Sequence, residues 1–193
     1  MTSPLKLPSS PVSLRQRRLN VLVTVGSVLL CLVLSPSRIP GMELLGVAPN
    51  WMLIWVVAWS VKRTPSQGAI AGLVMGLLQD SITAPHPTHT LSLIVVGVLT
   101  ARLQKQRYIQ EDIISIALIV FGMAVVAETV MALQVSIDRL FSANSLYPSL
   151  GEIWQFHQRV ALSSAILSSL WAPAVYYPLN RWWERYAPQD LTS

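Results

Sequence analysis

Three side chains that commonly bind metal ions or carry protons lie close together near the middle of the chain: Asp80, His86 and His89. A zinc site needs three or four histidine, cysteine or carboxylate ligands brought to one point. The single cysteine, Cys31, and the third histidine, His157, belong to other segments of the chain. We therefore expect no metal site here.

Asp80 closes an apolar helical segment, where a carboxylate faces the negative end of the helix dipole and is disfavoured. A compensating contact is therefore expected. In the interpretation that we favour the contact is local, and Asp80 and Ser81 accept hydrogen bonds from backbone N–H groups of the following turn. The alternative is a cation on the same side of the molecule, either Arg38 or His89.

Glu128 lies within the longest apolar stretch of the chain, residues 113–135. An ionisable group is costly in apolar surroundings, so its side chain should face protein or water and have a partner. The role of Glu128 is then either proton or substrate coupling, or a structural hydrogen bond between helices. No second acid or base in the apolar stretches completes a proton relay, which favours the structural role.

No catalytic or cofactor-binding residues are predicted. A cluster of serines in the last apolar stretch has no histidine beside it, as a nucleophilic site would require. The chain also has no glycine-rich phosphate-binding loop. We therefore expect a protein that is not an enzyme and needs no cofactor. The serines are Ser163, Ser164, Ser168 and Ser169.

Glycines and tryptophans recur at helical spacing in two neighbouring segments. Gly68, Gly72 and Gly76 share one helix face, which allows another helix to approach to backbone contact. The approaching helix belongs either to this chain, which we favour, or to a partner protein. Trp51, Trp55 and Trp59 form a similar stripe on the preceding segment. We expect Trp51 at a membrane interface and Trp55 against lipid or a neighbouring helix, with ligand stacking as the less favoured alternative.

Composition places these residues in a membrane protein. Of the 193 residues 52% are hydrophobic and 12% are charged, whereas a soluble domain carries about 25% charged residues. Six apolar segments predict an all-α, multi-pass membrane bundle. Only the last two apolar runs, 113–135 and 160–179, qualify alone for the roughly 20 residues that a single span needs, so the short runs in the middle of the chain should borrow flanking residues or lie within the bundle. The predicted spans are 19–37, 48–62, 65–79, 90–104, 113–135 and 160–180.

Positive charge sets the predicted orientation, because basic residues accumulate on the cytoplasmic side. With six spans and an internal N-terminus, eleven of the fourteen basic residues lie inside. The net charge of +5 is then explained by basic residues that set the topology and contact lipid headgroups. It does not imply binding to nucleic acid. A flexible cytoplasmic tail is expected at 1–18 and a short polar cytoplasmic tail at 187–193, on either side of a membrane domain at 19–186. Residues 149–159 predict a short surface helix, which begins with a capping box of Ser149 and Glu152.

Within the stretch 46–108, Pro49 and Asn50 lie at the start of the second apolar segment, and the glycine-rich third segment ends in Gly76, Leu77, Leu78 and Asp80. This stretch resembles the rod shape-determining membrane protein MreD family. In that family a Pro-Asp or Pro-Asn pair begins the second helix. A glycine-rich helix then ends in Gly-Leu-Leu-x-Asp. The matching residues here are Gly76, Leu77, Leu78 and Asp80. The chain departs from the family in the loop that follows, where 87–91 contains no glycine.

The resemblance implies a non-catalytic scaffold of the bacterial cytoplasmic membrane, involved in cell shape and lateral peptidoglycan synthesis. Its implied partners are MreC first, then the elongation transpeptidase, RodA and MreB in the same assembly, together with membrane lipids. The family fold is thought to be similar to the substrate-binding component of energy-coupling-factor transporters, so a small-molecule transporter subunit is the alternative function. Those subunits usually carry an Ala-x-x-x-Ala docking face on the first helix, and 19–34 contains no alanine.

Overall fold

The regular structure of this chain is helical. The computed structural model describes residues 14–37, 41, 43–83, 88–105, 112–141 and 149–186. Within these ranges every regular secondary-structure element is an α-helix, and one isolated β-bridge joins Leu44 to Val47. This confirms the predicted all-α class. The helices are α1 (Leu14–Leu34), α2 (Trp51–Ser60), α3 (Pro65–Asp80), α4 (His89–Lys105), α5 (Ile113–Phe141) and α6 (Leu150–Tyr186).

Side-chain caps fix the starts of α2 and α3. The Asn50 side chain accepts a hydrogen bond of 3.0 Å from the backbone N–H of Leu53, one of the groups that the first turn of a helix leaves unpaired. Thr64 and Gln67 form a capping box at the start of α3, and Pro65 occupies its first turn, where a missing N–H costs nothing. The short turn between α2 and α3 is therefore set by its own sequence.

The expected surface helix at 149–159 is not a separate element. The predicted capping box is confirmed, because Ser149 N–H donates to Glu152 Oε2 at 2.6 Å and Glu152 N–H donates to Ser149 Oγ at 3.3 Å. The helix that begins there continues to Tyr186, since no proline interrupts it before Pro173. Its 37 residues correspond to about 55 Å. That length exceeds the hydrocarbon core of a membrane, about 30 Å.

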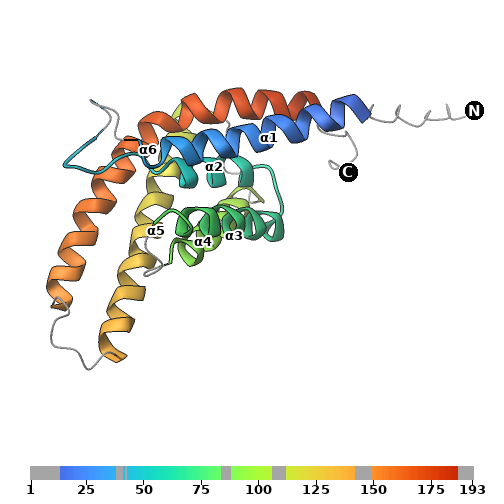
Figure 1. The fold of residues 1–193 in the computed structure, drawn as a ribbon. Helices are drawn as coiled ribbons and strands as arrows, with labels where there is room; N and C mark the ends of the chain where they lie inside the picture. Colours follow the sequence, from blue (N-terminus) through green and yellow to red (C-terminus); the bar gives the residue numbers. More distant parts are fainter. Residues whose placement is uncertain are drawn as a thin grey trace, which may run out of the picture.

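The six helices do not all run in one direction. Figure 1 shows α1, α2, α3, α4, the first part of α5 and the last part of α6 lying together, while the last part of α5 and the first part of α6 extend away from them as a hairpin. The expectation that all six helices form one bundle therefore does not hold for this hairpin. Two prolines, Pro173 and Pro178, lie inside α6 and remove backbone hydrogen bonds, which allows a long helix to bend.

The buried core is built around α2. Nine of its ten residues are buried, and it contacts each of the other five helices. Its largest fully buried side chains include Met52, Leu53 and Ile54. A helix that is apolar on all sides must be enclosed on all sides. This explains how a helix of ten residues holds the α1–α4 region together although it is too short to span a membrane alone.

Much of the remaining apolar surface is exposed. α5 and α6 are long and apolar enough to cross a membrane, whereas α1, α2 and α4 contain shorter apolar stretches. Soluble proteins seldom expose apolar patches of this extent, so we expect lipid or a partner protein to cover this surface. On α1 the large exposed apolar side chains are Leu19, Val21, Leu22, Val25, Leu29, Leu30 and Val33.

Candidate functional site

The predicted glycine row forms the contact between α3 and α4. A Cβ atom added at Gly72 would lie 2.2 Å from the carbonyl oxygen of Leu93, and one added at Gly68 would lie 2.3 Å from that of Gly97. These distances are far below ordinary van der Waals contact, so any side chain larger than hydrogen would push the helices apart. The two backbones therefore touch.

The contact continues to the end of α3 and is reciprocal. A Cβ atom at Gly76 would lie 2.3 Å from the Cα atom of Thr90, and one at Gly97 would lie 2.2 Å from the carbonyl oxygen of Gly68. The order of these contacts shows that the two helices run antiparallel. Of the two interpretations of the glycine row, the structure supports packing within the chain, because α4 covers the row from end to end.

Asp80 ties the end of α3 to the beginning of α4. Its Oδ1 atom accepts a hydrogen bond of 2.7 Å from the backbone N–H of His89 and lies 2.9 Å from His89 Nδ1. Its Oδ2 atom accepts from the backbone N–H of Thr90 at 3.2 Å and from the Thr90 hydroxyl at 2.6 Å. The carboxylate thus satisfies two of the backbone N–H groups that the first turn of α4 leaves open.

The electrostatics of this contact favour the charged carboxylate. Asp80 lies just past the third predicted span. Burial raises its pKa, but the hydrogen bonds from Thr90 and His89 outweigh burial and hold the pKa below its ordinary value. The positive end of the α4 dipole also favours an anion at this position. A charge that would be unfavourable at the end of α3 is therefore stabilised by the next helix.

The two expectations for Asp80 each hold in part. The carboxylate does cap backbone N–H groups, but they belong to the next helix and not to the next turn. Ser81 does not share this role, because its hydroxyl donates to a carbonyl of its own helix. The His89 ring is a partner as well, as the cation alternative proposed. Arg38 and His86 lie outside the described residues.

The Pro49–Asn50 pair joins the first turn of α2 to α6. Besides capping α2 with its side chain, Asn50 donates its backbone N–H to the buried Ser168 hydroxyl at 2.9 Å. Pro49 is buried beside it. The two leucines at the end of α3 have different surroundings, since Leu77 is exposed and Leu78 packs against the core. The polar residues of the motif therefore position helices, and Leu77 is available at the surface.

Glu128 has the partner that its burial predicted. Its Oε2 atom lies 3.2 Å from Nδ1 of His157 on α6, and the two side chains are 17% and 13% exposed. Two hollows of about 590 and about 360 Å³ are each lined by both residues. The pair therefore joins α5 to α6 at a point where the helices are not closely packed.

Sequence reasoning missed the partners on the opposite helices. Gly97 completes the glycine contact, and its spacing of four from Ala101 was an available signal of a small-residue face. His157 recurs at helical spacing with Ile153 in the predicted surface helix, but nothing in that pattern indicated Glu128. A further contact joins the start of α4 to α5, where the Gln134 side chain donates to the Thr88 carbonyl at 3.1 Å.

These features define an all-helical protein whose polar side chains join helices and whose apolar side chains remain widely exposed. Together with the two helices of membrane-spanning length, they indicate a membrane protein.

The comparison with protein families agrees with this class. The family model for the rod shape-determining protein MreD matches residues 16–177, which is most of the chain. The chain therefore belongs to the MreD family. No curated protein matches the chain closely enough to add a named relative. Family membership implies a role in rod shape determination, in association with the shape-determining machinery.

Proposed function

We propose that this protein is a non-catalytic membrane scaffold of the bacterial cell-elongation machinery, which supports lateral peptidoglycan synthesis. The match to the MreD family over residues 16–177 is the observation that carries the proposal. The polar contacts at Asp80, Asn50 and Glu128 support it, because each of them joins one helix to another. An assembly that holds partners in position needs such fixed geometry.

The proposed partners are MreC first, and the elongation transpeptidase, RodA and MreB within the same assembly. Since α4 covers the glycine row, partner helices must bind elsewhere. The exposed apolar face of α1 and the exposed leucines of α5 and α6 are the surfaces that we propose for this role. Leu22, Leu118 and Leu170 are each more than 65% exposed and mark these three surfaces.

The proposed location is the bacterial cytoplasmic membrane, with six crossings and both termini inside. The distribution of basic residues supports this orientation. Reporter fusions at Thr64, Leu146 and Ser193 test it, with the expected readings inside, outside and inside. An external reading at Ser193 would contradict both the number of crossings and the orientation.

Depletion of the protein in a rod-shaped host that has no second copy tests the function. A scaffold of the elongation machinery predicts that cells become round or wide and that MreC no longer localises normally. The transporter alternative predicts normal shape with a nutritional requirement or an uptake defect. Cells that keep their shape after complete loss would overturn the scaffold proposal.

A further inference from the structure

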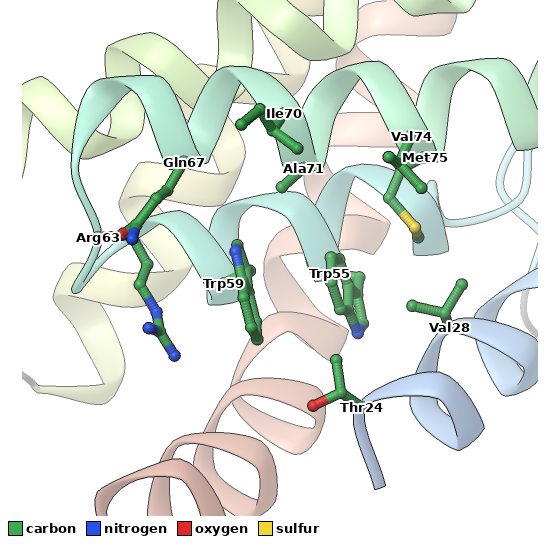
Figure 2. Close-up of a pocket in the computed structure, with 10 residues that line it drawn as sticks. All are labelled: Thr24, Val28, Trp55, Trp59, Arg63, Gln67, Ile70, Ala71, Val74 and Met75. Atoms are coloured by element: carbon green, nitrogen blue, oxygen red, sulfur yellow. The ribbon is translucent and has the colours of Figure 1, made fainter. Parts of the chain in front are cut away.

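A groove of about 310 Å³ lies between α1, α2 and α3, on the side of α3 away from the glycine contact. Figure 2 shows Trp55 and Trp59 side by side along one wall, Arg63 at one end, and Val28 and Met75 toward the other end. The volume is that of a small-molecule pocket. The groove is therefore long, apolar and charged at one end only.

The apolar wall is rigid. The rings of Trp55 and Trp59 are stacked, with centroids 5.4 Å apart and planes 8° from parallel. Trp183 of α6 lies edge-on against both rings. The Trp55 indole N–H donates to the Ser27 hydroxyl of α1 at 2.9 Å, so this ring is also held by α1. Such a preformed wall loses little entropy when it binds a flexible chain.

Arg63 supplies the charge. Its guanidinium carbon lies 4.4 Å from the centroid of the Trp59 ring, a cation–π contact that holds the side chain over the groove. Among the described residues no carboxylate forms an ion pair with Arg63, whereas its neighbour Lys62 pairs with Glu184 on α6. A half-buried guanidinium without an acidic partner is suited to bidentate contact with a phosphate.

The groove is accessible from the surface of the protein. Two of the α3 side chains that line it, Ile70 and Val74, are exposed. A ligand with a long apolar part could therefore enter sideways, from the same apolar surroundings that the exposed face of α1 requires. A polar solute would find one charged side chain and few other polar groups on these walls.

We propose that this groove binds one anionic phospholipid of the inner leaflet, with an acyl chain along Trp55 and Trp59 and the phosphate at Arg63. The cytoplasmic leaflet is rich in anionic lipid, which complements the charge at this end of the groove. The inference rests on the proposed location of the α2–α3 turn at the inner face of the membrane. The reporter fusion at Thr64 tests that location separately.

Lipid retention by the purified full chain tests the charged end. Delipidated protein in detergent is mixed with phosphatidylglycerol or with phosphatidylcholine that has the same acyl chains. Native mass spectrometry then measures the amount of lipid bound. We expect one phosphatidylglycerol per chain, bound about tenfold more tightly than phosphatidylcholine. Arg63→Gln should remove this preference. Lys62→Gln is the matched control, because it removes the same charge from the same turn and should keep the preference within about twofold.

A second pair of variants tests the apolar part. Val74→Trp places a large ring in the groove and should weaken phosphatidylglycerol binding about tenfold. Leu73→Trp adds a similar ring at the neighbouring exposed position, which does not line the groove, and should leave binding unchanged. Thermal unfolding of all four variants verifies that each is folded when its lipid binding is measured.

Three results would overturn the proposal. The first is equal retention of the two lipids by the unmodified chain. The second is an equal loss in Arg63→Gln and Lys62→Gln, which would show a general charge effect. The third is displacement of the bound lipid by millimolar inorganic phosphate, which would show a site for soluble anions. Each of them leaves the scaffold proposal intact, because cell shape on depletion is measured independently.

Discussion

The antiparallel pair α3–α4 is joined by direct backbone contact along its glycines, whereas the antiparallel pair α5–α6 is joined at Glu128 and His157 by a contact between polar side chains. In the first pair, backbone atoms of α3 and α4 touch along the glycine row, and Asp80 caps the junction. In the second, Glu128 and His157 meet beside two hollows. Added side-chain volume should therefore disrupt the first pair along the glycine row, whereas the hollows beside Glu128 and His157 leave space for side chains in the second.

The largest expected effect tests this difference directly. Gly72→Leu introduces a side chain where a Cβ atom alone would lie 2.2 Å from the Leu93 carbonyl oxygen, so α3 and α4 must separate. We expect a loss of about 3 kcal/mol in the free energy of unfolding, and low abundance in the membrane. Gly122→Leu on α5 is the control, since nothing lies within 4 Å of its added Cβ. Equal stability of the two variants would contradict the close α3–α4 contact.

The Asp80 cap should have the next largest effect. Asp80→Ala removes an acceptor from two backbone N–H groups of α4 and from the Thr90 hydroxyl. We expect a loss of about 2 kcal/mol, measured by denaturant unfolding in detergent. Asp138→Ala, at an exposed position on α5, is the control and should change stability by less than about 0.5 kcal/mol. If the control lost a similar amount of stability, the effect would come from the removal of a negative charge anywhere in the protein, and not from loss of the cap.

The dependence of stability on pH gives a second test of the Asp80 cap. Because the native pKa of Asp80 lies below its ordinary value, the contribution of the cap to stability is complete above about pH 5. It should be lost as the pH falls through the lower native pKa. The loss should be smaller than that of Asp80→Ala, since a protonated carboxyl still accepts hydrogen bonds. In Asp80→Asn, the part of the stability loss below pH 5 that comes from protonation of Asp80 should be absent. An unchanged acid profile in that variant would show that Asp80 does not cause it.

Features that lie within one segment could be predicted from the sequence, and features that join distant segments could not. The capping box of Ser149 and Glu152 and the shared face of Gly68, Gly72 and Gly76 follow from spacing along one helix. Helical spacing states which residues share a face, but it does not identify the helix that meets that face. Gly97 and His157 were therefore missed as partners.

The direction of the α5–α6 hairpin belongs to the same class of features. Apolar length predicts that α5 and α6 are helices of membrane-spanning length, and this is confirmed. Hydropathy carries no information about the angle between one helix and the next, because that angle follows from the packing of side chains. For the same reason the continuity of α6 across 159–160 was not predicted, although the absence of proline before Pro173 permitted it.

The smallest expected effect concerns the contact between Glu128 and His157. A double-mutant cycle of Glu128→Ala and His157→Ala should give a coupling of about 0.6 kcal/mol, typical of a hydrogen bond between helices in a membrane. A parallel cycle of Glu128→Ala with Gln158→Ala is the control and should be additive, because Gln158 lines the same hollow without a hydrogen bond to Glu128 among the described contacts. Zero coupling in the first cycle would contradict the contact. If Glu128→Ala abolished cell-shape maintenance with stability, abundance and partner binding unchanged, the structural role would be wrong and proton or substrate coupling would take its place.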